Sequence, residues 1–236
     1  MHIGIVHLDS NQAEFIARAV RGAELTPAIL PPDVGAETLA QFQALVLLTP
    51  LTNPETFMAL VGMAKLGTPV LGIGKAAATL LISGLVPGVE DDRAVINLKP
   101  NAHAATQRLR VCLTKDYQRN AFTLQWAKEA VVSLTLTNEE SAIDLPHGLL
   151  LELKAHGLGV LAYCDERGLI ESTTAINPAG SADNLAAISN KAGNVLAFLP
   201  DLDDADAASA IFQSLHDYLS EGFFEPVPPL FYYPRR

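Results

Sequence analysis

A glycine-rich corner between a predicted strand and a predicted helix is the place in this chain best suited to hold a reactive group. The apolar run Pro69–Leu71 leads into Gly72-Ile73-Gly74-Lys75, and a helix-forming run starts at Ala76. In α/β proteins such a corner lies at the carboxyl end of the sheet, where nucleophiles and ligands are placed. A nucleophile elbow needs Ser or Cys at its tip, and this chain has Gly74 there.

The same corner has the composition of a modest anion-binding site. Lys75 stands where free backbone N–H groups meet the positive end of a helix. His7, just after the first predicted strand, can face the same crevice. Gly74, Lys75 and His7 are therefore candidate ligand-binding residues for a small anionic molecule. The corner is not a P-loop, because Pro69 and Ala76 replace the first glycine and the Ser/Thr of that motif.

The chain has two cysteines, Cys112 and Cys164. Cys164 follows an apolar run and lies at a predicted strand end, whereas Cys112 alternates along an ordinary strand. Neither spacing fits a nucleophile elbow, and two cysteines make neither a disulfide framework nor a zinc site. We expect both to be structural, and we expect no metal ion and no cofactor.

An acidic cluster precedes the last predicted helix. It consists of Asp201, Asp203, Asp204 and Asp206. Clustered carboxylates can bind a divalent cation. They also stabilise and cap a helix N-terminus, which is the interpretation we favour.

Composition limits the class of protein. The 236 residues carry a formal charge of −10 and are 49% apolar, so we expect one folded domain with or without an appended segment. The negative charge argues against nucleic acid as the main partner. No apolar run reaches the roughly 18 residues of a membrane span, and the start has no basic leader. We expect a cytoplasmic protein.

The first third of the chain alternates strand and helix signals. Asp9, Ser10 or Asn11 can cap a helix that runs to about Gly22, and Pro54 can open another at its first position. The predicted strands are His2–Leu8, Pro27–Leu30, Ala44–Leu48 and the run before the glycine-rich corner. Such alternation predicts a parallel, doubly wound sheet.

The second part of the chain is predicted to be strand-rich, with antiparallel additions to the sheet. The strand-like runs are Arg108–Thr114, Phe122–Trp126, Val131–Thr137, Leu149–Leu153, Leu158–Tyr163 and Asn194–Leu199. Asp204–Leu219 is predicted to be a helix, because its apolar residues recur on one stripe.

Three landmarks, in order along the chain, resemble the class I glutamine amidotransferases. The first is Val70-Leu71-Gly72-Ile73, followed by a helix and Gly84-Leu85-Val86-Pro87-Gly88. The second runs from Asn177 to Ile188 and is similar to the segment NPNGS-x-x-NIAGI. The third runs from Asn190 to Pro200 and is similar to N-x-x-GNVLG-x-MPHPE. These segments resemble in particular the PurQ family, the glutaminase subunits of phosphoribosylformylglycinamidine synthase.

The resemblance implies a fold, a domain boundary and an activity. The fold would be a flavodoxin-like, doubly wound, mostly parallel sheet with helices on both faces and additional antiparallel strands. The amidotransferase-like domain would span residues 1–221. The family activity is glutamine hydrolysis that supplies ammonia to a synthetase of purine biosynthesis, and it uses a Cys nucleophile, a His base and a Glu that orients the His.

The same resemblance places other residues at each catalytic position. The family's Cys falls on Gly74, and its His and Glu fall on Asp201 and Asp203. The oxyanion loop falls on Thr49-Pro50-Leu51, where Pro50 has no N–H to donate. Loss of a triad nucleophile alone costs about a millionfold in rate in a comparable hydrolase. The resemblance therefore implies a homologue that is inactive as a glutaminase.

The last residues, 222–236, form an aromatic, proline-rich segment. Its aromatic residues are Phe223, Phe224, Phe231, Tyr232 and Tyr233. Exposed aromatic side chains are costly unless they are covered. The segment either packs on the domain itself or docks on a partner, which would be a synthetase-type subunit or a second copy of the chain.

Three functions remain open at this point. The first is a non-catalytic interaction or scaffold subunit of a synthetase complex related to purine biosynthesis. The second is an enzyme or binding protein that holds a small-molecule ligand in the former active-site crevice. The third is a glutaminase that borrows catalytic groups from a partner, and the missing nucleophile makes it the weakest of the three.

Overall fold

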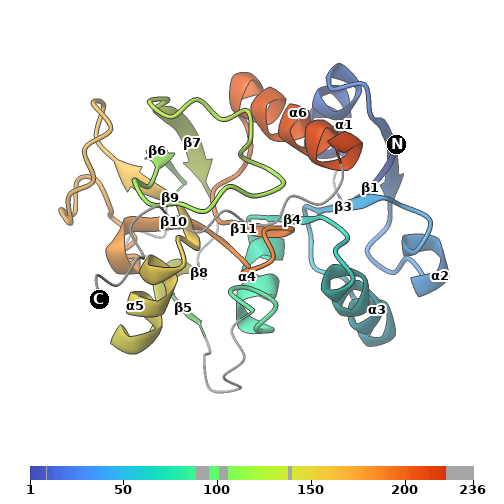
Figure 1. Ribbon diagram of the computed structural model, residues 1–236, viewed down its shortest axis with the longest axis horizontal. Helices are drawn as coiled ribbons and strands as arrows, with labels where there is room; N and C mark the ends of the chain where they lie inside the picture. The colour runs from blue at the N-terminus through green and yellow to red at the C-terminus, as the bar shows by residue number, and fades with distance from the viewer. Residues whose placement is uncertain (9, 89–95, 101–105, 138–139, 222–236) are drawn as a thin grey trace, which may run out of the picture.

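The computed structural model describes residues 1–8, 10–88, 96–100, 106–137 and 140–221. A nine-stranded sheet runs through the molecule (Figure 1). In spatial order its strands are β2 (Thr26–Leu30), β1 (His2–Val6), β3 (Ala44–Leu47), β4 (Val70–Ile73), β11 (Val195–Phe198), β10 (Leu185–Ser189), β9 (Gly159–Cys164), β6 (Gln107–Leu113) and β7 (Val132–Leu136). All of these strands except β6 and β10 run in the same direction. The expected mostly parallel α/β fold with antiparallel additions is confirmed.

Four strand–helix units build the first part of the sheet, as the alternation of signals predicts. Their helices are α1 (Ser10–Gly22), α2 (Ala36–Leu39), α3 (Pro54–Lys65) and α4 (Lys75–Ile82). The remaining elements are β5 (Asn97–Pro100) and β8 (Glu140–Asp144), which pair in a separate two-stranded sheet, α5 (His147–Ala155), the short 3-10 helix η1 (Ala182–Asn184) and α6 (Ala205–Glu221). Pro54 opens α3, and the Asn53 side chain caps this helix by accepting from Glu55 N at 2.9 Å.

Helices cover both faces of the sheet. In Figure 1, α1 and α6 lie side by side above the sheet, and α3, α4 and α5 lie below it. Ile16 of α1 and Ile211 of α6 belong to one buried apolar cluster, and Leu80 of α4 and Leu153 of α5 belong to the other. The central strands β3, β4 and β11 are buried on both faces, which accounts for their continuous apolar sequences.

Two predicted strands are wrong. Phe122–Trp126 forms consecutive turns, and Phe122 and Trp126 are buried because they fill part of the core from this loop. Leu149–Leu153 lies inside helix α5. An apolar run of this length is compatible with the two-residue repeat of a strand and with the 3.6-residue repeat of a helix. The buried residues Leu149 and Leu153 are four positions apart, as on one face of a helix.

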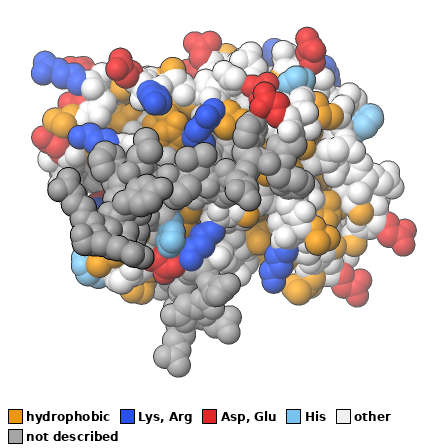
Figure 2. Space-filling view, in the orientation of Figure 1, with side chains coloured by type: hydrophobic (Ala, Val, Ile, Leu, Met, Phe, Trp, Pro, Cys, Tyr) orange, Lys and Arg blue, Asp and Glu red, His pale blue; other side chains and the backbone are white. Residues whose placement is uncertain are grey.

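The predicted aromatic segment, 222–236, lies outside the described residues. Among the described residues, no helix combines the length and the apolar content needed to cross a bilayer. On the face of the molecule drawn in Figure 2, basic and acidic side chains are interspersed with apolar ones.

Candidate functional site at the carboxyl edge of the sheet

The corner between β4 and α4 has, at Gly74, a backbone conformation that is open to glycine but strained for other residues. Gly74 adopts φ 58° and ψ −119°, outside the regions that side-chain-bearing residues favour. Its N–H donates to the carbonyl of Phe198 on β11 at 2.9 Å, which fixes the corner to the neighbouring strand. Gly72 brings the helix close to the strand, because a Cβ there would lie 2.6 Å from a methyl group of Leu80. The corner thus has the sharp strand-to-helix turn that the sequence predicts.

Asp201 faces this corner. It follows β11, and its Oδ1 atom lies 3.3 Å from the position that a Cβ would take at Gly74. The other carboxylate oxygen accepts from Thr137 Oγ1 at 2.7 Å, and the Asp201 N–H donates to the Thr135 carbonyl at 2.7 Å. Burial raises the pKa of the Asp201 carboxyl, the hydrogen bond from Thr137 lowers it, and the charge of Asp203 raises it further. A half-buried carboxylate, that of Asp201, therefore lies beside Gly74 at the tip of the corner.

Asp203 lies in the same segment but binds a different set of groups. Its carboxylate accepts from Arg108 Nη1 at 3.0 Å and from Thr135 Oγ1 at 2.5 Å. The intervening Leu202 is buried. The carboxylate of Asp201 thus binds Thr137, just after β7, whereas that of Asp203 bridges Arg108 on β6 and Thr135 on β7.

Strand β7 contacts the site although it is far from β4 and β11 in the order of the sheet. β7 is the last strand at one edge of the sheet, yet Thr135 also forms an isolated antiparallel bridge with Asp201. The sheet curls so that its edge strand lies beside the segment that follows β11. Thr135, Thr137 and Arg108 are functional-site neighbours that the sequence interpretation missed, because nothing local in their sequence marks this long-range pairing.

The loop after β3 is held by packing and by its own backbone. Thr49, Pro50 and Leu51 are half-buried, and Leu51 packs against an apolar cluster. The N–H of the following residue, Thr52, donates to the Pro32 carbonyl at 3.0 Å. Pro50 offers no N–H, so it cannot contribute a backbone donor to an oxyanion hole.

The other candidate ligand-binding residues lie on neighbouring elements. Lys75 is the first residue of α4 and is exposed. His7 follows β1 and is half-buried. The carboxyl ends of β1 and β4 lie on the same edge of the sheet, because both strands pair in parallel with β3.

The acidic cluster divides into separate structural roles. Asp204 caps α6, since its Oδ1 accepts from the N–H groups of Asp206 at 3.1 Å and Ala207 at 2.9 Å. This confirms the predicted capping role for Asp204, whereas Asp201 binds Thr137 and Asp203 binds Arg108 and Thr135. No group of three or more His, Cys, Asp or Glu side chains suited to a metal ion occurs in the part of the chain that the structure describes.

The asparagines of the Asn190–Leu196 landmark are structural. Asn194 is buried, and its amide donates to the carbonyls of Ala64 at 2.7 Å and Thr68 at 3.0 Å. Asn190 accepts from the N–H groups of Asn194 and Val195. These bonds fix the β10–β11 hairpin to the turn between α3 and β4, and hence to the strand that ends at the glycine-rich corner.

The Asn177–Ile188 landmark is structural in the same way. Asn177, Ser181 and Asn184 are buried and bonded to one another through their side chains and backbone. Asn184 also donates to the carbonyls of Tyr163 at 3.2 Å and Glu171 at 2.8 Å. The landmark therefore attaches η1 to the end of β9.

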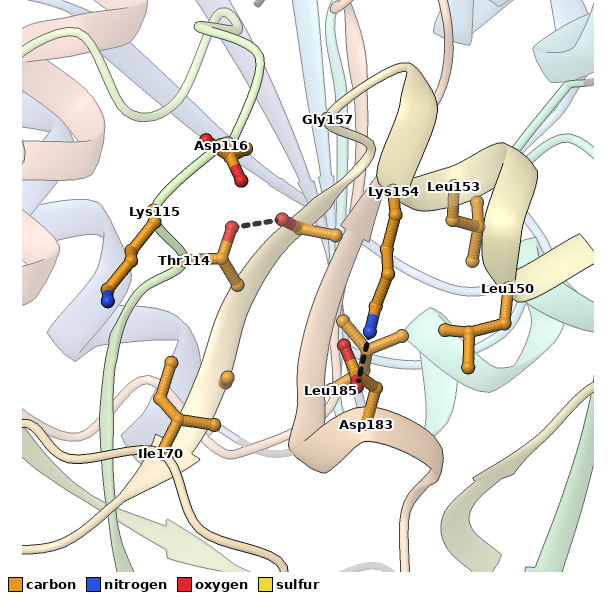
Figure 3. A pocket seen from close by; sticks show the side chains of 12 residues that line it. Thr114, Lys115, Asp116, Leu150, Leu153, Lys154, Gly157, Ile170, Asp183 and Leu185 are labelled. Carbon is orange, nitrogen blue, oxygen red and sulfur yellow. Dashed lines mark hydrogen bonds and ion pairs between the residues drawn. The ribbon is translucent and has the colours of Figure 1, made fainter. Parts of the chain in front are cut away.

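A cavity of about 260 Å³ lies beside α5 and β9 (Figure 3). Apolar residues of α5 and β10 line one side, among them Leu150, Leu153 and Leu185. Lys154 and Asp183 also line it and form an ion pair of 2.7 Å. Its lining includes neither the glycine-rich corner nor the acidic segment after β11, so it is separate from the site described above.

Comparison with known proteins identifies the family. The family model for the CobB/CobQ-like glutamine amidotransferase domain matches residues 37–216. The chain is 30% identical over 157 residues to a phosphoribosylformylglycinamidine synthase subunit PurQ of Aquifex aeolicus, covering 66% of this chain and 63% of that protein. It is 30% identical over 168 residues to the PurQ subunit of Methanosarcina mazei, covering 68% of each chain. The match thus spans somewhat less than two thirds of the Aquifex protein's length.

Solved structures agree at the level of the fold. The chain is similar to a chain of the structure of PurLQS from Thermotoga maritima, with a TM-score of 0.65 and 15% identity over 92% of this chain and 98% of that chain. It is also similar to a protein from Thermoplasma acidophilum assigned as a GMP synthase component, with a TM-score of 0.59 and 13% identity over 94% of each chain. The chain belongs to the glutamine amidotransferase family and is a PurQ-like homologue of class I.

Proposed function

We propose that this chain does not hydrolyse glutamine and that it serves as an interaction subunit of a synthetase complex related to purine biosynthesis. The observation that carries the proposal is the contact between Gly74 and Asp201. The tip of the corner has no side chain, and a carboxylate lies 3.3 Å from the place where a Cβ would begin. A glutaminase of this class needs a thiolate there and an imidazole beside it to take and return its proton.

The two thiols of the chain do not replace the missing nucleophile. Cys112 and Cys164 are buried on β6 and β9. An elbow nucleophile stands at a strand-to-helix turn, where helix N–H groups help to stabilise the developing oxyanion. Neither cysteine occupies such a turn, because Cys112 lies within its strand and Cys164 is followed by the turn at residues 165–169.

The charge of the corner disfavours the alternative of an anionic ligand. The N-terminus of α4 attracts negative charge. The Asp201 carboxylate already lies beside it, and the Asp203 carboxylate raises the pKa of Asp201 further because the two negative groups repel each other. An added anion would meet the same repulsion, although Lys75 is exposed nearby. A role in protein binding is therefore the better proposal for this domain.

The identity of the partner is proposed by analogy with the relatives. The matched proteins are named as subunits of phosphoribosylformylglycinamidine synthase, and the similar structure is that of PurLQS. The proposed partner is accordingly the host's synthetase subunit of that type. The segment 222–236 supplies the proposed contact through its five aromatic residues, Phe223, Phe224, Phe231, Tyr232 and Tyr233.

An ammonia assay tests the catalytic part of the proposal. The full chain is incubated with glutamine, with and without the synthetase subunit, and an intact PurQ relative serves as the positive control. The expected result is no ammonia above the level that the synthetase partner produces without this chain. Turnover that disappears in Asp201→Ala or Cys164→Ala would refute the proposal, because it would show that the chain supplies its own catalytic group.

A binding experiment tests the interaction part separately. Affinity for the purified synthetase subunit is measured for the full chain, for the triple variant Phe231→Ala, Tyr232→Ala, Tyr233→Ala, and for the control Arg235→Ala, Arg236→Ala. Binding is expected for the full chain and the control, with a loss of at least about tenfold in the aromatic variant, which corresponds to about 1.4 kcal/mol. Absence of binding by the full chain rejects the proposed partner, whereas equal affinity in all three proteins rejects the proposed contact.

A further inference from the structure

The two cysteines face each other across neighbouring strands. In the antiparallel pairing of β6 and β9, Cys164 lies opposite Arg110 and Cys112 lies opposite Ala162. Cys112 is two residues from Arg110, so both thiols project from the same face of the sheet as diagonal neighbours. Both are buried, with exposed fractions of 6% and 3%, and both are free thiols.

The surroundings of the pair are polar on one side. The Cys112 thiol donates to the carbonyl of Gly168 at 3.6 Å. Gly168 belongs to a turn in which the Asp165 carboxylate accepts from the N–H groups of Arg167 and Leu169, each at 2.8 Å. The thiols therefore lie under a short turn that is held by its own hydrogen bonds, and not within a continuous apolar layer.

A cavity reaches Cys164 from the surface, and Cys112 lies diagonal to Cys164 outside the lining of this cavity. It has a volume of about 290 Å³, and Cys164 is part of its wall together with Arg110, Asp165 and Glu166. A cavity of this size admits small polar molecules, whereas the low exposure of both cysteines restricts the approach of a bulky disulfide.

The two thiols are chemically unequal. A hydrogen bond from Cys164 lowers the pKa of the Cys112 thiol, although burial opposes this effect. The same hydrogen bond, together with burial, raises the pKa of Cys164. A thiolate is the nucleophilic form of cysteine, so Cys112 is the thiol expected to react first and Cys164 the one that retains its proton.

We propose that Cys112 and Cys164 form a redox-sensitive pair that hydrogen peroxide converts into an intramolecular disulfide. The Cys112 thiolate attacks one oxygen of the peroxide, the O–O bond breaks, and Cys112 becomes a sulfenic acid while hydroxide leaves and takes a proton. The Cys164 sulfur then attacks the sulfenic sulfur. An S–S bond forms, the S–O bond breaks, and the oxygen leaves as water with the Cys164 proton. Overall, two thiols are oxidised and one peroxide is reduced to two waters.

The geometry makes the disulfide reversible. Diagonal neighbours in an antiparallel pair are about 7–8 Å apart at Cα, whereas disulfides favour about 5.5–6 Å. Closing the bond requires β6 and β9 to shift toward each other, and a disulfide that needs such a shift is easily reduced. The bond would join the strand that carries Arg108, which binds Asp203 at the site, to the strand whose end is held by Asn184.

Thiol counting and intact mass spectrometry test the proposal. The full chain is treated with a small excess of hydrogen peroxide, the excess is removed with catalase, and free thiols are counted in denaturant. The count is expected to fall from two to zero, with a mass loss of about 2 Da that dithiothreitol reverses. Cys112→Ser and Cys164→Ser are the matched variants. Neither can lose this mass, and Cys112→Ser is expected to react with peroxide at least about tenfold more slowly than Cys164→Ser.

The same measurements define the outcomes that overturn the proposal. Two thiols that remain after treatment would show that the pair is inert. A gain of oxygen mass without the loss, or a disulfide-linked dimer, would show that the thiols react independently. Equal reaction rates of the two serine variants would contradict the assigned order of attack.

Discussion

Asp201 Oδ1 lies 3.3 Å from the position that a Cβ would occupy at Gly74. The two residues are far apart in the chain, and parallel pairing of β4 with β11 brings them together. Residue 74 is the tip of a strand-to-helix corner, and residue 201 lies in the connection between β11 and α6. Any side chain introduced at the corner must therefore share its space with a carboxylate.

Gly74→Ala is expected to destabilise the protein by about 1–3 kcal/mol, since its φ of 58° strains a residue that carries a Cβ. The new methyl group also meets Asp201, so the same change should cost less in an Asp201→Ala background. Denaturant unfolding measures both values. Gly62→Ala is the control, because Gly62 lies in helix α3 with no neighbouring atom within 4 Å. It should stabilise by about 0.5–1 kcal/mol. A neutral Gly74→Ala would show that the corner relaxes freely.

Asp201→Asn is expected to stabilise the protein at neutral pH. Burial raises the pKa of Asp201 above its usual 3.8. As pH rises from 3.8 to the raised value, the unfolded chain releases this proton first, so the folded state binds more protons and stability falls. The neutral amide avoids that loss and can still accept from Thr137.

The pH dependence provides the control for this variant. Unfolding midpoints are compared at about pH 7 and at about pH 3, where the carboxyl is protonated in both states and the advantage of the amide should vanish. Asp33→Asn changes an exposed carboxylate and serves as the reference substitution. An Asp201→Asn variant that is less stable than the original at neutral pH would mean that the bonds to Thr137 outweigh the burial of the charge.

The ion pair between Arg108 and Asp203 is expected to contribute little to stability. Its N–O distance is 3.0 Å, but the side chains are 55% and 36% exposed. A double-mutant cycle with Arg108→Gln and Asp203→Asn should give a coupling energy below about 1 kcal/mol, which falls further in high salt. A coupling well above that value, unaffected by salt, would indicate that the pair is held in a drier site than its exposure implies.

Asn194→Ala is expected to be strongly destabilising, by at least about 2 kcal/mol. The change leaves the Ala64 and Thr68 carbonyls without their side-chain donor and removes the partner of Asn190. Thermal or denaturant unfolding measures the loss. Asn97→Ala, an exposed position on β5, should shift stability by less than about 0.5 kcal/mol. Similar losses in both variants would argue against a structural role for the buried asparagine.

Local sequence patterns predicted most of the elements but not all of them. Apolar runs between turn signals located β1, β3, β4 and β11, whose burial on both faces requires such runs. The same reasoning failed at 149–153, where an apolar run is compatible with strand and helix alike. It also failed at 122–126, where apolar residues fill the core from a loop.

For the candidate site, too, the residue types come from the sequence and their contacts come from the structure. The glycine at the corner, the proline in the loop after β3 and the aspartates after β11 can be read directly from the chain, because residue type alone decides whether a thiol, an N–H or an imidazole is present. What Asp201 contacts could not be read in this way. Its neighbours are Thr135, on the strand at the far edge of the sheet, and Thr137, just after that strand, and only the curl of the sheet brings them to the site.

Two things follow from the sequence alone. Residue type shows that the corner lacks a thiol, and the order of the landmark segments shows which family the chain resembles. The surroundings of these residues required the three-dimensional arrangement. The Gly74 corner faces a half-buried carboxylate, and Cys112 lies diagonal to Cys164, because of strand order and register. Order and register are set by pairing between segments that are distant in the chain, and no local pattern encodes them.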